Sequence, residues 1–257
     1  MNFWHSTLYG FVQGFTEFLP ISSSAHLAML PRVMNISEPG VHFDFAMHIG
    51  TFIALLFLFR SKIILELEII FKQKKLSDFA RKIIFATFVS VVFILLFKPF
   101  AEINRFSKLI AFNMIIGGLL LAYAEKIKNS QDKLNFFQSG VLGFFQAVAL
   151  FPGVSRSGAT ITVAKFMGLS KSAAAEFSFM ASLPIMLAGI LYEIKNYQQF
   201  VSAPFSFSLV LWGIVTSCFF GFIALKLFTF FIEKIPFWFY GVYRVIFGIS
   251  LLFFFNR

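Results

Sequence analysis

The sequence predicts an all-α, polytopic membrane protein built from two repeats of opposite orientation. The first reason is composition: of 257 residues, 58% are hydrophobic and only 13% are charged, and the mean hydropathy is +0.82. A soluble domain carries about 25% charged residues, and one soluble core cannot bury 41 phenylalanines. The second and third reasons are an internal duplication and the order of the apolar segments within each copy.

Two segments about half a chain apart resemble each other without a gap. Residues 10–26 read GFVQGFTEFLPISSSAH, and residues 143–159 read GFFQAVALFPGVSRSGA. The coinciding positions include the pairs Gly10/Gly143, Gln13/Gln146, Ser22/Ser155 and Ser24/Ser157. The chain is therefore expected to be a single membrane domain over 1–257, with repeats over 1–125 and 133–257 joined by a short polar segment.

Each repeat is expected to begin with two short apolar helices and to continue with three helices that can cross the hydrocarbon core. In the first repeat the expected helices cover 3–19 and 25–34, then 43–59, 83–100 and 108–124. In the second repeat they cover 137–151 and 159–169, then 174–192, 207–228 and 237–255.

The two short helices of each repeat are separated by PISSS or by PGVSRSG, whose proline, glycine and serine residues interrupt helices. Pieces this short suit a re-entrant helical hairpin better than full crossings. Three crossings per repeat is an odd number, so the second repeat is expected to be inverted, with a site between the repeats near the bilayer midplane. A simple bundle of about eight to ten crossings is the alternative.

The net charge of +10 is distributed as in a membrane protein. Seven Lys and Arg residues lie within 60–82, between two apolar spans. This pattern indicates that 60–82 and 125–136 are cytoplasmic and attract anionic lipid headgroups, while 193–206 lies outside. Nucleic acid is not expected as a partner, because the charge follows the expected loops.

Two charged residues, Glu17 and Arg156, lie in the interruptions, although an arginine inside a membrane helix costs about 2.5–3.5 kcal/mol. Serines precede both of the helices that follow, and helix N-termini favour anions. The planar fork of arginine matches phosphate, so a phosphate site is expected here. Its expected phosphate-binding residues are Ser22, Ser24, Ser155, Ser157, Gly158 and Thr160. An ion pair that only holds the fold is the alternative reading of both charges.

A carboxylate repels phosphate, so Glu17 needs a role of its own. Holding Mg²⁺ or Ca²⁺ against the phosphate oxygens would resolve the conflict, and a general-base role is the other option. Ser23 and His26 lie three residues apart, on one face of the first helical turn. His26 could activate Ser23 or attack phosphorus itself, while a buried structural histidine is the alternative.

Other polar residues are expected to be structural. His42 and His48 fall on different faces of their helix, so they are not expected to hold a metal ion together. Gln13 and Gln146 occupy equivalent positions in the two repeats and are expected to bond to each other across the hairpins.

Two long motifs, QGFTEFLPISSSAHL (13–27) and FPGVSRSGAT (151–160), closely resemble the signatures of the bacterial undecaprenyl-diphosphate phosphatases of the BacA/UppP type, the bacitracin resistance proteins. The resemblance covers essentially the whole chain, and two long motifs in order are more specific than a short pattern. It implies hydrolysis of undecaprenyl diphosphate to the monophosphate in the bacterial plasma membrane, at a site open to the outer face. This activity recycles the lipid carrier of peptidoglycan synthesis and confers bacitracin resistance.

By motif position, the active-site residues of that family correspond to Glu17, Ser23, His26 and Arg156. Many members carry glutamate where this chain has Gln13, which can offer a metal ion only an uncharged amide oxygen. The expected reaction is in-line attack on the terminal phosphorus by Ser23, by His26 or by a water activated by His26.

The expected partners are the polyprenyl diphosphate substrate and membrane lipids, and the sequence leaves a homodimer open. A polyprenyl-phosphate carrier or flippase is the alternative function, because inverted repeats with broken helices are also a transporter architecture. A purely structural scaffold would give the charged residues of the interruptions no purpose.

Overall fold

The computed structural model describes residues 1–36, 38–103, 107–129, 131–195 and 206–255. Within these residues the regular structure is helical, apart from one isolated bridge between Gln131 and Leu169. The first half contains α1 (Phe3–Phe18), α2 (Ser23–Met34), α3 (Val41–Gln73), α4 (Asp78–Ile103) and α5 (Ser107–Ala124). The second half contains α6 (Phe136–Val148), α7 (Arg156–Phe166), α8 (Lys171–Lys195), α10 (Phe207–Phe231) and α11 (Phe237–Phe255).

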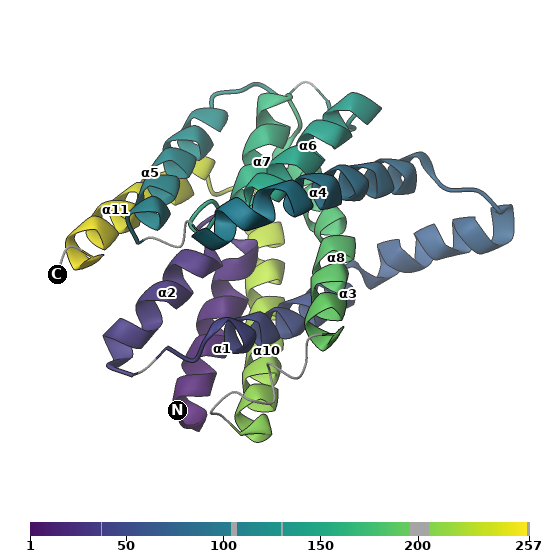
Figure 1. Cartoon of the computed structure of the whole chain (residues 1–257). Coiled ribbons are helices and arrows are strands. Elements are labelled where there is room, and N and C mark those ends of the chain that lie inside the picture. Colours follow the sequence, from purple (N-terminus) through teal and green to yellow (C-terminus); the bar gives the residue numbers. More distant parts are fainter. Residues whose placement is uncertain (37, 104–106, 130, 196–205, 256–257) are drawn as a thin grey trace.

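Each half of the described chain has two short helices followed by three longer ones (Figure 1). The short pairs α1–α2 and α6–α7 begin and end within a few residues of the segments predicted from the sequence. The all-α prediction is therefore confirmed, and so is the position of both helix interruptions.

The two interruptions have the same local geometry. Ser22 and Ser155 both adopt a left-handed backbone, with φ of 71° and 69°, a conformation that is strained for residues other than glycine. In each break the serine hydroxyl also lies close to the hydroxyl two residues later, at 3.2 Å for Ser22 and Ser24 and at 3.3 Å for Ser155 and Ser157. The duplicated sequence thus folds into a duplicated break.

The two halves pack against each other through equivalent helices. Helix α1 packs along α10, α6 packs along α4, and α5 lies beside α11 (Figure 1). Glycine permits the close approach: a Cβ at Gly10 would lie 2.7 Å from Gly213 O, and a Cβ at Gly143 would collide with the carbonyl oxygen of Ala86. Small residues at helix contacts are typical of membrane proteins, and this pair of glycines occupies matching positions in the repeats.

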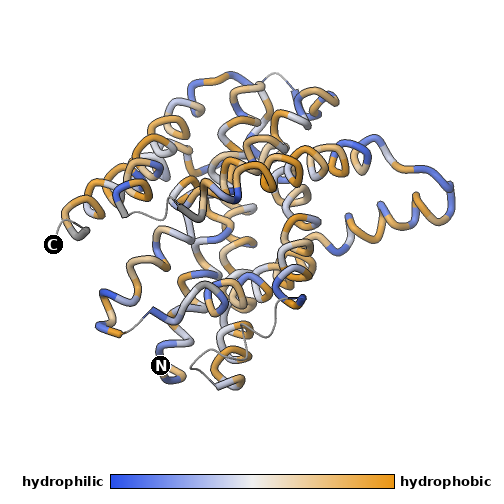
Figure 2. The backbone as a smooth tube through the Cα atoms, viewed as in Figure 1, coloured by the Kyte–Doolittle hydropathy of each residue, from blue (hydrophilic) through white to orange (hydrophobic). Residues whose placement is uncertain are grey.

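Three helices within the described residues are long and apolar enough to cross a membrane, namely Asp78–Ala101 of α4, α8 and α10. The chain is accordingly a polytopic membrane protein, and three of the six predicted spans are confirmed by length and composition. The predicted spans 108–124 and 237–255 fall on the shorter apolar helices α5 and α11, and 43–59 lies within α3. Hydrophobic residues follow the helices along most of their length (Figure 2).

The prediction that 60–82 is a loop is wrong. Helix α3 continues to Gln73 and α4 begins at Asp78, so the two helices form a hairpin that projects from the rest of the molecule (Figure 1). The polar residues after position 60 do not end the helix, because lysine and glutamate are good helix formers and Glu68 pairs with Lys72 one turn later. The tip of this hairpin is hydrophilic (Figure 2), while most of the predicted outer loop 193–206 lies outside the described residues.

Candidate active site

The carboxylate of Glu17 contacts residues from both halves of the chain. Glu17 lies in the last turn of α1 and is 8% exposed. Its Oε2 accepts hydrogen bonds from Gln13 Nε2 at 2.9 Å and from Ser23 Oγ at 2.7 Å. Its Oε1 accepts from Arg156 Nη2 at 2.5 Å, from the start of α7. The structure therefore brings together Glu17, Ser23 and Arg156, which the sequence had selected separately.

Two buried polar atoms of this cluster have no hydrogen-bond partner among the described residues, Gln13 Oε1 and Arg156 Nη1. An unsatisfied buried donor or acceptor costs roughly 1–3 kcal/mol, so each one calls for an explanation. An anionic oxygen would satisfy the guanidinium nitrogen of Arg156. A cation or an N–H donor would satisfy the amide oxygen of Gln13.

Hydrogen bonds tie the two helix breaks to each other. Ser157 Oγ donates to Leu19 O at 3.0 Å, and Gly153 N donates to Ser24 Oγ at 3.2 Å. Ser155 caps α7 by accepting from the backbone N–H of Gly158 at 3.0 Å. The first turns of α2 and α7 leave backbone N–H groups without intrahelical acceptors, and N–H groups at a helix start are of the kind that anions bind in proteins.

Arg244 of α11 anchors both breaks, although the sequence analysis did not select it. Arg244 is fully buried; its Nη1 donates to Pro20 O at 3.3 Å, and its Nη2 donates to Gly153 O and Val154 O at 3.0 and 2.8 Å. The C=O and N–H of a planar trans peptide point in opposite directions. Because the carbonyls face Arg244, the N–H groups that follow them face away from it.

His26 makes contacts different from those expected. Its Nδ1 donates to Ser22 O at 2.7 Å, its Nε2 accepts from the Tyr243 hydroxyl at 2.6 Å, and its ring stacks on Phe247 with 4.4 Å between centroids. The hydroxyl of Ser23 donates to the carboxylate described above. The Ser23–His26 hydrogen bond suggested by the helical spacing is therefore not formed, since α11 supplies the histidine with an aromatic surface and a hydroxyl.

His48 lies at the site, whereas His42 does not. The Nε2 of His48 is 3.6 Å from Glu17 Oε2, and its Nδ1 donates to Asp44 O at 3.1 Å. His42 instead bonds to Glu193 at 3.0 Å. The two histidines do fall on different helix faces, but the interpretation of both as structural overlooked the face of α3 that packs against α1.

Comparisons with known proteins identify the family of this chain. The family model described as bacitracin resistance protein BacA matches residues 6–250. The chain belongs to this family. Three relatives are undecaprenyl-diphosphatases: from Geotalea daltonii, 36% identical over 100% of this chain and 99% of the relative; from Sulfurimonas denitrificans, 33% over 100% of both; and from Campylobacter curvus, 37% over 99% of this chain and 100% of the relative.

The two repeat-related glutamines of this BacA-family protein are not bonded to each other, contrary to expectation. Gln146 Nε2 donates to Ser90 Oγ at 3.1 Å and to Ala181 O at 3.3 Å, whereas the amide of Gln13 faces Glu17. The reason is the packing across the halves, because α1 and α6 lie on different partner helices. Of the two glutamines, Gln13 alone belongs to the polar cluster around Glu17.

Thr160 and Gly158, both expected to bind phosphate, have structural contacts in this fold. The hydroxyl of Thr160 donates to Arg156 O at 2.8 Å and lies 2.5 Å from Ser178 Oγ of α8. Gly158 lies so close to Arg244 that a side chain would collide with its guanidinium. The serines of the two breaks also bond within the fold, to each other and to backbone groups.

The polar cluster fits a divalent cation in composition. Within the described residues there is no group of three His, Cys, Asp or Glu side chains that could hold a metal ion. Glu17 and Gln13 nevertheless provide oxygen atoms of the kind that Mg²⁺ and Ca²⁺ bind, and Gln13 Oε1 has no other partner there. A cation held by this protein would therefore take its remaining ligands from phosphate oxygens or water.

Proposed function

We propose that this protein hydrolyses undecaprenyl diphosphate to undecaprenyl phosphate and orthophosphate. The observation that carries the proposal is the buried Glu17–Arg156 cluster between two helix N-termini, in a chain whose relatives are named undecaprenyl-diphosphatases. The reaction regenerates the lipid carrier for peptidoglycan synthesis. It also removes the diphosphate that bacitracin sequesters, which accounts for the family description.

Arg156 and the N-terminal turns of α2 and α7 are the proposed binding groups for the diphosphate. In the transition state negative charge gathers on the equatorial oxygens of the transferred phosphoryl group. Fixed guanidinium and N–H donors stabilise this charge because they need no reorganisation in a site shielded from water. The serines Ser22, Ser24, Ser155 and Ser157 shape the two breaks that present these donors.

Ser23 is the proposed nucleophile, supported by its 2.7 Å hydrogen bond to Glu17. Glu17 would take the hydroxyl proton while Ser23 Oγ bonds to the terminal phosphorus and the bridging P–O bond breaks, releasing the lipid monophosphate. Water then hydrolyses the phosphoserine. His26 and a directly attacking water are the rivals.

An acid quench during turnover tests the choice of nucleophile. Phosphoserine at Ser23, detected by mass spectrometry and absent from Ser23→Ala, is the expected result. Phosphohistidine at His26, or full turnover by Ser23→Ala, would reject Ser23 as the nucleophile.

A divalent cation, Mg²⁺ or Ca²⁺, is the proposed cofactor, with Glu17 and Gln13 as the protein ligands. When bound, it would supply positive charge to the phosphate oxygens and so reduce their repulsion from the carboxylate. The unpartnered Gln13 Oε1 supports this assignment.

We further propose an inverted repeat in the bacterial plasma membrane, with re-entrant hairpins at α1–α2 and α6–α7 and a site open to the outer face. The matching breaks at Ser22 and Ser155 support two copies of one fold. A homodimer is a second proposal: only 11% of the apolar span of α4 is buried, and a second copy could cover this helix. Light scattering of the purified protein measures the assembly.

Phosphate release from a C55 diphosphate by purified protein in detergent, with and without EDTA, separates hydrolysis from carriage. Detergent leaves no second compartment, so turnover there supports the enzyme and loss of turnover in EDTA supports the cation. A carrier or flippase would instead show no phosphate release in detergent and transfer of lipid phosphate between leaflets of proteoliposomes.

A further inference from the structure

An apolar pocket of about 370 Å³ lies between α5, α6, α7 and α11. Its aliphatic and aromatic lining includes Ile116, Leu120, Phe145, Val148, Val163 and Phe166. Concave, mostly apolar pockets with few polar groups are the usual form of binding sites for small organic ligands. The residues assigned to catalysis above do not line this pocket.

The charged and amide side chains that line the pocket are already engaged. All three guanidinium nitrogens of Arg244 lie within 3.4 Å of backbone carbonyl oxygens. Asn113 Nδ2 donates to Pro152 O at 2.8 Å. Because these donors face the backbone, the pocket offers an incoming molecule a hydrocarbon surface and not a second anion site.

The pocket lies between residues that flank the second break and the outer surface of the helices. Val154 and Gly158 line its inner side and flank the Ser155–Ser157 segment that carries Arg156. Ile116, Leu120 and Phe166 line it as well and are 55%, 46% and 38% exposed. In a membrane protein, exposed apolar side chains of this kind face lipid.

We infer that this pocket binds the phosphate-proximal part of the isoprenyl chain of the lipid diphosphate, an inference that rests on the proposed function. The substrate is one molecule with an anionic end and a hydrocarbon chain. Its chain must leave the phosphate site beside α7, and the pocket is the hollow that begins there. An acyl chain of a membrane lipid could contact the same apolar surface. A phospholipid, however, carries no diphosphate that Arg156 could bind, so nothing would fix its position in the pocket.

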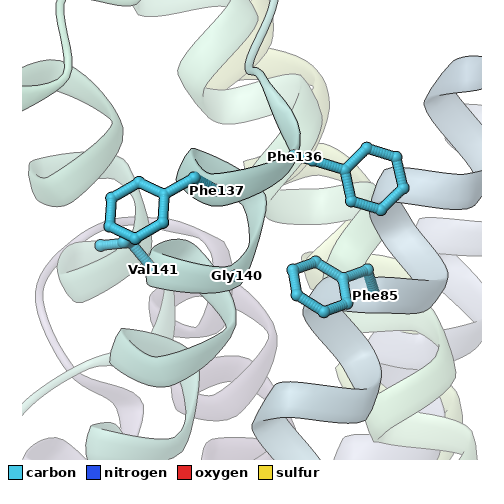
Figure 3. A pocket seen from close by; sticks show the side chains of 5 residues that line it. All are labelled: Phe85, Phe136, Phe137, Gly140 and Val141. Carbon is cyan, nitrogen blue, oxygen red and sulfur yellow. The ribbon is translucent and has the colours of Figure 1, made fainter.

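A second apolar hollow, of about 320 Å³, is placed differently. It lies between Phe85 and Phe136 on one side and Phe137 and Val141 on the other, with Gly140 at its floor (Figure 3). These residues belong to the first turns of α6 and to α4, whereas the break that carries Arg156 follows the other end of α6, about 20 Å along the helix. A chain bound there would not position a diphosphate at the phosphate site.

Two pocket variants and a matched control test the inference in detergent. Leu120→Trp and Ile116→Trp fill the pocket, whereas Leu119→Trp places the same bulk on an exposed position of α5 outside it. The measurements are KM for farnesyl diphosphate, a C15 substrate, and Ki for inorganic pyrophosphate, which is the head group without a chain. We expect KM to rise about tenfold or more in the pocket variants, with an unchanged Ki and with Leu119→Trp like the parent.

The outcomes separate the chain site from the proposed function. An unchanged KM in both pocket variants, or an equal rise in KM and Ki, overturns the chain site while leaving the phosphatase intact. The same rise in Leu119→Trp assigns the effect to bulk lipid contacts and also overturns it. Failure of the parent protein to hydrolyse either the C15 or a C55 diphosphate overturns the proposed function itself.

A photoreactive group on the first isoprene units of farnesyl diphosphate gives a second test that needs no variant. Crosslinks to α5 and α7, competed by unlabelled farnesyl diphosphate, are the expected result. Crosslinks confined to other helices, or crosslinks to α5 and α7 that only phospholipid displaces, would contradict the chain site.

Discussion

Glu17 and Arg156 depend on each other because both are buried in a largely apolar body. Their side chains are 7% and 16% exposed, and they are joined by a 2.5 Å hydrogen bond. A buried ion pair contributes little net stability, but removing one partner leaves an unpaired charge and costs about 3–5 kcal/mol. Substitutions at this pair therefore have to be judged on stability and on turnover separately.

We predict that Arg156→Ala and Arg156→Lys both lose turnover, by on the order of 10²- to 10³-fold in kcat. Lysine keeps the charge but not the planar fork that binds two oxygens at once. Phosphate release by detergent-purified protein is the measurement, with thermal unfolding recorded in parallel. Lys62→Ala is the control, because it removes an ion pair with Glu176 outside the site. Near-normal turnover by a folded Arg156→Ala protein would contradict the proposal that Arg156 binds phosphate.

Replacing Gln13 with glutamate should increase the dependence on a divalent cation. In the present structure the amide of Gln13 donates to Glu17 at 2.9 Å. Gln13→Glu replaces this donor with a second carboxylate, and two carboxylates in contact repel each other unless a cation lies between them. We expect a lower Mg²⁺ or Ca²⁺ concentration for half-maximal hydrolysis, a lower Tm in EDTA, and recovery of Tm on adding the cation.

A Gln13→Glu protein with an unchanged or higher half-maximal concentration would show that position 13 does not hold the cation. Gln146→Glu is the matched control, since Gln146 occupies the equivalent position but contacts Ser90 and Ala181 instead. A cation effect common to both variants would argue against a local site.

The sequence was sufficient to select Glu17, Ser23 and Arg156, because each stands in a polar interruption between apolar segments. It did not lead to Arg244, although an arginine in the apolar run 237–255 meets the same criterion of an expensive buried charge. His48 and Tyr243 lie inside helices, away from the interruptions, so the sequence pattern does not single them out. Only the packing of α3 and α11 against the first hairpin brings them to Glu17 and His26.

At the level of the helices, Arg244 links α11 to both breaks and should act as a positioning residue. We predict that Arg244→Met lowers kcat by on the order of 10- to 100-fold, as loss of groups that orient ligands does in metal sites. The Ki for inorganic pyrophosphate should rise in parallel, because the N–H groups of the breaks lose their orientation. Arg244→Lys should recover part of both quantities, since an ammonium group satisfies some of the carbonyls.

Ser250→Ala is the control for α11, because this hydroxyl donates only to Phe247 O of its own helix. If Arg244→Met lowers Tm but leaves kcat and the Ki for pyrophosphate unchanged, Arg244 serves stability alone. A parallel loss in Arg244→Met and Ser250→Ala would point to a general disturbance of α11.

The short helices and their breaks could be predicted because proline, glycine and serine mark them locally. The length of α3 could not, since the polar stretch after Arg60 lowers hydropathy without weakening helix propensity. Whether such a stretch continues as a helix depends on the side chains of other helices that it contacts. Here Lys62 of α3 pairs with Glu176 of α8, and Ser77 donates to Glu66 at 2.5 Å across the hairpin.

At the scale of the whole molecule, the proposed inverted repeat predicts a definite topology. The tip of the α3–α4 hairpin and the segment between α5 and α6 should face the cytoplasm, and both termini should face the opposite side. Single cysteines at Asn2, Lys75 and Lys128 and after the last residue, in a Cys218→Ala background, can be labelled in intact cells. Cys218 is the only native cysteine. Opposite labelling of the two termini would contradict the inverted repeat.

The duplication could be predicted from two 17-residue segments of sequence, but the way in which the copies combine could not. The structure places the first helix of each half on the fourth helix of the other, α1 on α10 and α6 on α4. Apolar helices carry little information about their partners. The contacts of Gly10 with α10 and of Gly143 with α4 show that the shared glycine lets two helices approach closely.

The separation of Glu17 and Arg156 along the chain has a consequence for biosynthesis. The arginine is synthesised 139 residues after the glutamate, and Arg244 follows 88 residues later still. During translation the first hairpin is therefore made before the arginine that pairs with Glu17. A nascent chain that stops after α5 would retain His48 near Glu17 but would lack the guanidinium that pairs with this carboxylate. The Glu17–Arg156 pair can therefore form only after the start of the second half has been synthesised.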